Sequence, residues 1–396
     1  MALLLAVVIV LMQLQPALSR DGDYFGGYGA ISVIIEFGRP LALIFLFLLG
    51  FGLIISNRGK FRINTSVFSW IFLVLFLVFS LKYIVAGELA KGTQGFLLVA
   101  VQLLVASLCF YHSADQSLGS KVRFMTLISV YTFWMFSLLC IYLIFFYADN
   151  SFNYSDRFHG PTSNPNHTAL LVALCFPGVL FYGDNHSKAR MYVFYGLAFA
   201  VTTGILIACG SRTSMLAVAL SFFCWLFVKL ASAHNAEFGL VGKIAVGIFL
   251  LVMLVSLNAS VSGLSAFERG NTRAEHWLRG VDMFLLDPLL GAPLQPDGTF
   301  LLVENTWIAA SSTLGLFGLF CSILLLWLLA RQSMRVVFNP RQQERAFVSI
   351  ASVTILVCSF GEAFLLGFFK GHTFLALLLL AGAPVIFKSE AMVRHT

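Results

Sequence analysis

The amino-acid sequence predicts an all-α, polytopic membrane protein, and composition is the first reason. Hydrophobic residues make up 59% of the 396 residues and charged residues only 11%, and phenylalanine alone occurs 41 times. Typical soluble domains contain about 25% charged residues. A water-soluble fold could not bury this much apolar side chain, so we expect lipid to be the solvent for most of the surface. The second reason is that the apolar residues form runs of membrane-spanning length.

These runs predict about twelve transmembrane helices, because a helix needs roughly 20 apolar residues to cross the hydrocarbon layer. They lie at about 2–18, 40–56, 66–86, 95–112, 124–147, 169–182, 191–210, 215–231, 243–260, 305–330, 347–365 and 372–387. The first run, Met1–Leu18, is either a retained span or a cleaved signal peptide. We favour the retained span because no basic segment leads it.

Basic residues in the short loops predict the sidedness of the helices. The most basic loop runs from Arg331 to Arg345, and the positive-inside rule places it in the cytoplasm. Counting back through alternating spans puts the basic segments 58–62, 121–123 and 188–190 on the same side. Both termini are then cytoplasmic.

Two longer loops are left on the outer side, at 148–168 and 261–304. The chain 1–396 is otherwise a single integral membrane domain. Function in such proteins concentrates in the loops and at the helix ends that face them. We therefore expect the functional residues on this outer side.

Neither the cysteines nor the histidines have the spacing of a metal site. The seven cysteines all fall inside apolar runs and form no CxxC pair, which is typical of small buried residues. The eight histidines are scattered. We predict no metal and no cofactor. The net charge of +7 comes from short loops without a long basic stripe, which argues against nucleic-acid binding.

Arg212 stands between two spans at the predicted outer surface. A guanidinium there is costly unless it has an anionic partner or reaches the interface. The simpler interpretation is a flanking anchor. The functional interpretation is a phosphate clamp, because arginine presents a planar fork to phosphate oxygens.

A stretch of the outer loop after Asn271 has helical periodicity. On such a helix Arg273 and Trp277 share one face. One interpretation is an interfacial helix that Trp277 anchors at headgroup level. Because Arg273 and Arg279 face the same compartment as Arg212, they also predict a second basic group for a diphosphate.

Glu304 opens the next span, beside Asn305. Burial would raise the pKa of this carboxyl group toward the range of a general base. The alternative is an ordinary water-facing carboxylate. Other ionisable residues inside the spans rank lower because several are near enough to a helix end to reach water. They are Glu36, Arg39, Lys82, Glu362 and Lys370.

These residues match motifs of the O-antigen ligases and polymerases, which are bacterial membrane glycosyltransferases. Arg212 and Leu216 fit the R-x-x-x-L signature of the ligases. Asn305, nine residues and then Gly315-x-x-Gly318 fit their H-N-x9-G-x-x-G signature except at its first position.

Other segments resemble elements that the ligases share with O-antigen and exopolysaccharide polymerases. They are Asn164-Pro165-Asn166, Arg273-x-x-x-Trp277 and Asp287-Pro288-Leu-Leu-Gly291. The matched region is 160–320, and the family's fold is all-helical with outer loops forming a cavity above the membrane.

The sequence departs from the ligase signature at Glu304, where the ligases have histidine. An acidic residue before Asn305 looks more like polymerases of capsular or exopolysaccharide units, and the outer loop is short for a ligase. We therefore favour polymerisation of lipid-linked repeat units over ligation of the glycan to lipid A core.

The resemblance implies metal-free glycosyl transfer at the periplasmic face of the bacterial inner membrane. The donor would be a glycan on undecaprenyl diphosphate, the acceptor another lipid-linked glycan or lipid A core, and a chain-length regulator a further partner. Arg212, with Arg273 and Arg279, would bind the diphosphate and stabilise its developing charge. Glu304 would accept the proton of the attacking hydroxyl, with inversion at the anomeric carbon. Further substrate contacts are expected from His276, Trp277 and Asn305.

Two other classes of function stay open. A transporter or flippase would need polar groups near the bilayer midplane on several helices, whereas the candidates here cluster at the outer edge. A purely structural membrane subunit would be insensitive to substitution of Arg212.

Overall fold

The computed structural model of the chain consists of packed α-helices. It describes residues 1–15, 30–56, 67–112, 118–152, 157–183, 188–233, 272–295, 300, 303–338, 343–367 and 370–393. Within these ranges there is no β-strand, and a single isolated β-bridge joins Phe152 to Phe158. The all-α prediction is therefore confirmed.

The helices coincide with every predicted apolar run that falls in the described ranges. They are α1 (Ala2–Gln13), α2 (Ala30–Ser56), α3 (Val67–Val85), α4 (Leu89–His112), α5 (Leu118–Phe146), α6 (Ala148–Ser151), α7 (Pro165–Gly183), α8 (Lys188–Cys209), α9 (Arg212–Ala233), α12 (Thr272–Leu286), α13 (Thr306–Phe338), α14 (Gln343–Gly361), the 3-10 helix η1 (Phe364–Leu366) and α15 (Gly371–Val393). Among the described residues, eight helices are long and apolar enough to span a membrane. The length and apolar composition of these helices make the chain a multi-pass membrane protein. The number of twelve transmembrane helices stays a prediction. The run at 243–260 lies outside the described residues.

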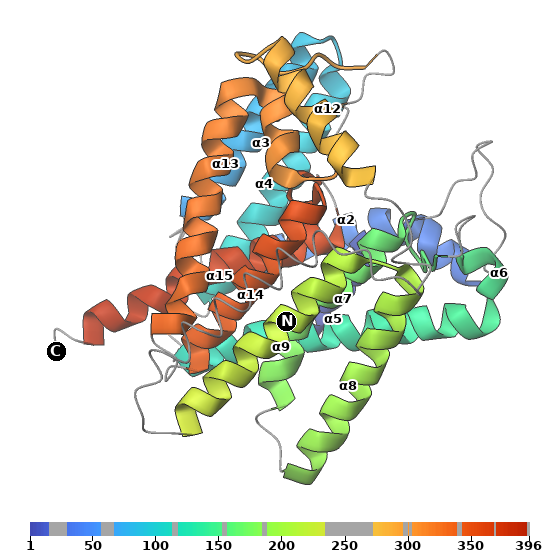
Figure 1. Cartoon of the computed structure of the whole chain (residues 1–396), viewed down its shortest axis with the longest axis vertical. Helices are drawn as coiled ribbons and strands as arrows, with labels where there is room; N and C mark the ends of the chain where they lie inside the picture. Colours follow the sequence, from blue (N-terminus) through green and yellow to red (C-terminus); the bar gives the residue numbers. More distant parts are fainter. Residues whose placement is uncertain are drawn as a thin grey trace.

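Two groups of helices lie on either side of α14 and α15 (Figure 1). One group contains α5, α7, α8 and α9, and the other contains α3, α4, α12 and α13. Helix α14 packs on α13 as well as on α7 and α9, and α15 packs on α4, α1 and α5. Helix α7 is buried along almost its whole length. The first helix, α1, has only 12 residues and packs in the core against α2, α5 and α15.

The ends of the helices separate the predicted outer loops from the basic segments. At one end of the bundle, hydrogen bonds join the ends of α1 and α14 to the starts of α7, α13 and α15, and the end of α8 to the loop before α7. The start of α9 packs against the end of α14 at the same place. Lys121 and Arg123 lie in the first turns of α5, and Lys188 and Arg190 in the first turn of α8, so both pairs lie at the opposite end. This separation agrees with the predicted alternation of the spans.

Two glycines of the family-like motifs bring the turn after α12 against a break in α13. Gly291 and Gly315 have φ angles of 73° and 59°, in the left-handed region that favours glycine. The N–H of Leu316 donates to the carbonyl of Pro288 at 2.7 Å across this junction. A Cβ atom on Gly315 would lie 2.5 Å from the backbone oxygens of Pro288 and Leu289. Glycine is therefore needed at both motif positions so that the two backbone segments can pack in direct contact.

Lys82, near the end of α3, holds the same junction together. Its ammonium group donates to the backbone carbonyls of Leu290, Gly291, Ala292 and Thr313 at 2.5–3.0 Å. These backbone carbonyls have no helical hydrogen-bond partner at the turn and at the helix break, so the charged lysine serves as their donor. This contact gives the lysine inside a span a structural explanation.

Substitution of Gly315 by alanine is expected to destabilise the protein by at least about 2 kcal/mol, because the left-handed φ and the contact with backbone oxygens both oppose a Cβ atom. The apparent melting temperature of the purified protein in detergent measures this effect. Gly204→Ala is the matched control, since nothing lies within 4 Å of its Cβ position in α8. Equal melting temperatures for the two variants would contradict the packing explanation.

Candidate functional site

Arg273 is the centre of a group of polar side chains that come from distant parts of the chain. It lies in the first turn of α12, where its Nη2 is 3.1 Å from Oε1 of Glu362 and its Nε is 3.5 Å from Oε2 of Glu304. Its Nη1 donates a hydrogen bond to Oγ1 of Thr213. The side chain of Glu304 is 43% exposed and that of Glu362 only 9%. One carboxylate therefore faces solvent and the other is buried.

Glu362 reaches this group because the end of α14 is pressed against the start of α9. A Cβ atom on Gly361 would lie 2.2 Å from Oγ1 of Thr213, so only glycine allows this approach. Oγ1 of Thr306 donates to the backbone carbonyl of Glu362 at 2.8 Å and ties the segment to the start of α13. Three helix ends therefore fix the position of the buried carboxylate.

Asn305 and Trp277 fix the backbone around Glu304. The Oδ1 atom of Asn305 accepts the N–H groups of Trp307 and Ile308 at 2.9 and 3.0 Å, which caps α13. Nδ2 of Asn305 donates to the carbonyl of Phe360 at 3.0 Å. Nε1 of Trp277 donates to the carbonyl of Glu304 at 3.1 Å. Both residues were predicted as substrate contacts, and these bonds give them a positioning role.

Arg212, the first residue of α9, lies close enough to Arg273 for the two positive charges to repel each other. Within the part of the chain that the structure describes, it makes no ion pair and no hydrogen bond through its side chain. Arg273 is held by protein groups, whereas the guanidinium of Arg212 keeps its donors for a ligand. An arginine in this situation fits an anion with several oxygens, such as a phosphate.

The sequence analysis missed Arg157, which belongs to the predicted outer loop 148–168. Its Nε donates to the carbonyl of Cys209 at 2.7 Å, and its Nη2 to Oδ1 of Asn166 at 2.6 Å. Its charge also acts on Glu362. The signal was present in the sequence, because Arg157 is a cation next to the motif that contains Asn166.

The sequence analysis ranked Glu362 and Lys370 below the residues of the outer loops. The charge of Lys370 acts on Glu362, and its Nζ is 3.3 Å from Nε2 of His167. Intramembrane charges are costly and mark functional sites by default. Glu362 follows that rule here, since it belongs to the group of Arg273, and Lys370 lies beside this group.

The structure does not bring every predicted residue to this group. The helix predicted after Asn271 is confirmed as α12, with Arg273 and Trp277 on one face. Arg279 and His276 are exposed on other faces of α12 and have no hydrogen bond or ion pair within the described ranges. The part of the predicted loop at 261–271 lies outside the described residues.

The two carboxylates on Arg273 differ in their surroundings, because Glu362 is buried at the end of α14. Glu304, for which the sequence analysis left burial and exposure to water both open, is the water-facing member of the pair.

Comparison with models of protein families found none that matches this chain, and comparison with curated proteins found no match either. No group of three or more histidine, cysteine or acidic side chains that could hold a metal is present among the described residues. The site is defined by three cations, Arg157, Arg212 and Arg273, and by two carboxylates, Glu304 and Glu362.

Proposed function

We propose that the protein is a glycosyltransferase that polymerises lipid-linked oligosaccharide repeat units at the periplasmic face of a bacterial inner membrane. One observation carries the proposal. Three cations, Arg157, Arg212 and Arg273, lie around the carboxylates of Glu304 and Glu362 at one end of a helix bundle. The excess of positive charge suits a diphosphate, and the exposed carboxylate suits the acceptance of a proton. The positive-inside rule places this end outside the cytoplasm and both termini inside it.

The reaction that fits this arrangement is a metal-free displacement at an anomeric carbon. A hydroxyl oxygen of the acceptor sugar forms the new bond to that carbon, and the bond from the carbon to the diphosphate oxygen breaks. The proton of the hydroxyl passes to Glu304, and the electron pair of the broken bond leaves with the diphosphate. Arg212 stabilises the charge that develops on the leaving group.

Arg273 acts mainly through its neighbours in this mechanism. Its guanidinium is shared between Glu304 and Glu362, so it sets the distance between the proton acceptor and Arg212. Arg279 and His276 on the exposed faces of α12 are left to contact the glycan.

Transfer by the purified protein in nanodiscs tests the proposal. The protein receives native undecaprenyl-diphosphate repeat units alone and then with lipid A core, and the products are separated on a gel. A ladder from repeat units alone supports a polymerase. Transfer only in the presence of lipid A core would make the protein a ligase, and no transfer in either case would favour a transporter.

A further inference from the structure

A second group of cations lies beside the first, where α15 begins and α1 ends. Lys370 contacts Nε2 of His167, and Arg39 of α2 is close enough for its charge to act on both of these residues. Nη2 of Arg39 donates to Oε1 of Gln15 at 2.7 Å. The backbone N–H of Gln15 in turn donates to the carbonyl of Pro161 at 3.0 Å. Segments far apart in sequence thus bring two cations together.

This group lacks an anion of its own. Among the described residues no carboxylate lies within ion-pair distance of Arg39 or Lys370, and the carboxylate that acts on Lys370, Glu362, is paired with Arg273. Nε of Arg39 is buried without a hydrogen-bond partner. Two like charges held together by neutral partners are unfavourable unless an anion joins them.

A buried histidine next to this group also has an unused polar atom. His372 is fully buried, its ring centroid is 5.1 Å from that of His167, and its Nδ1 is 2.9 Å from Oε1 of Gln13. Its Nε2 has no partner in the described part of the chain. Because Nδ1 donates to Gln13, this Nε2 is an acceptor, so the binding of an anion is left to Arg39, Lys370 and His167.

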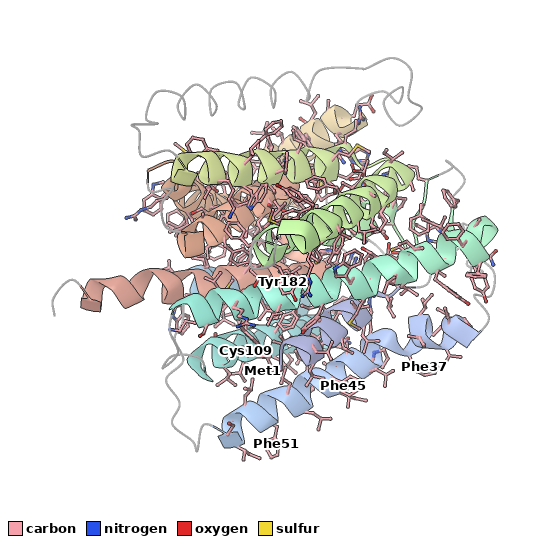
Figure 2. All side chains as sticks on the ribbon, turned by 90° about the horizontal axis from the view of Figure 1, so that it is seen from below. Met1, Phe37, Phe45, Phe51, Cys109 and Tyr182 are labelled. Atoms are coloured by element: carbon pink, nitrogen blue, oxygen red, sulfur yellow. The ribbon has the colours of Figure 1, made fainter. Side chains whose placement is uncertain are left out.

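Arg39 can be reached from the lipid phase. Helix α2 lies at the edge of the molecule, and Phe37, Phe45 and Phe51 are spread along it (Figure 2). Phe37 and Leu41, on either side of Arg39, are 56% and 39% exposed. A lipid whose headgroup binds at Arg39 could therefore keep its tail in the bilayer along α2.

We infer that Arg39, Lys370 and His167 form a second anion site, separate from the site at Arg212, that binds the diphosphate headgroup of a second lipid. That this lipid is the acceptor of the transfer rests on the proposed function. A polymerase joins two lipid-linked repeat units, so it needs two lipid diphosphates at once. Glu362 relates the two sites, since it pairs with Arg273, the neighbour of Arg212, and its charge acts on Lys370.

Counting bound lipids tests this inference without any transfer reaction. The full-length protein in phosphatidylcholine nanodiscs is titrated with undecaprenyl diphosphate that carries no glycan, and bound lipids are counted by native mass spectrometry. We expect two per wild-type chain and one per chain of the double variant Arg39→Gln, Lys370→Gln. The second lipid should bind at least about tenfold more weakly in that variant, or roughly 1.4 kcal/mol.

Three controls make the count specific. Arg39→Lys keeps the charge and should keep the second lipid, and Arg123→Gln, at the opposite end of the bundle, should bind two. Arg212→Gln should lose the other lipid. Two lipids on the double variant, or one on the wild type, would overturn the inference. Displacement by equimolar inorganic diphosphate would assign the site to a soluble anion instead.

The lipid count tests the second site and the transfer assay tests the proposed function, and either can give a negative result without the other. A wild-type chain that binds two lipids but transfers no sugar would contradict the proposed function and leave the second site in place. Sugar transfer by a chain that binds only one lipid would contradict the second site and leave the proposed function in place.

Discussion

Replacing Arg212 with glutamine is expected to lower the rate of transfer from a lipid-diphosphate donor by about 100- to 1,000-fold, the cost of removing one preorganised donor from a developing charge. Its guanidinium lies next to Arg273 and, within the described ranges, is not engaged by a carboxylate. Its donors are therefore free to bind the leaving group. Initial rates of the purified protein in nanodiscs measure the effect.

The lysine variant separates charge from geometry at the same position. Arg212→Lys keeps the positive charge but lacks the two parallel N–H donors, so it should recover only part of the rate. Arg123→Gln, which removes an exposed arginine at the opposite end of the bundle, is the matched control and should leave the rate unchanged. Wild-type rates for Arg212→Gln, with the same melting temperature, would remove Arg212 from the mechanism.

Local sequence patterns predicted the helices and part of the site for a physical reason. A transmembrane helix is set by the apolar length of its own residues, and the faces of α12 follow from helical periodicity alone. Hence the spans, and the shared face of Arg273 and Trp277, were predictable. The predicted outer location of Arg212 and Glu304 likewise needed only the alternation of the spans.

The rest of the site depends on packing between segments that are far apart in the chain. Arg273 and Glu362 are separated by 89 positions, and their contact requires the ends of α14 and α9 to touch. No local pattern around Glu362 predicts which cation will face it. Lys82 is a second example, because the sequence showed it only as a charge inside a span. Its partners are backbone carbonyls at a helix break that only the fold reveals.

The structure also changes the expected division of roles between Arg273 and Arg212. A guanidinium shared by two carboxylates and Thr213 has few donors left for a diphosphate. We therefore assign Arg273 to the positioning of Glu304 and leave the leaving group to Arg212. Loss of either arginine should reduce transfer, but only Arg212 should affect the binding of undecaprenyl diphosphate directly.

Glu304→Gln is expected to lower the rate of transfer by about 100- to 10,000-fold, because an amide of the same size cannot accept the proton of the attacking hydroxyl. The substitution should leave stability nearly unchanged, since the side chain is 43% exposed and its contact with Arg273 is 3.5 Å long. The backbone around it, fixed by Asn305 and Trp277, does not depend on the carboxylate. Rates at saturating substrate, with melting temperatures as the control, measure this.

Histidine at the same position provides the sharper test of a base. Glu304→His keeps a proton acceptor and should retain far more activity than Glu304→Gln. Because a free imidazole titrates about two pH units above a free carboxylate, the acid limb of its pH–rate profile should move to higher pH. An unchanged profile, or full activity of Glu304→Gln, would mean that another group takes the proton. Glu362, the second carboxylate on Arg273, would then be the next residue to replace. Because Glu362 is buried, it can accept the proton only if the acceptor hydroxyl passes Glu304 and enters the bundle.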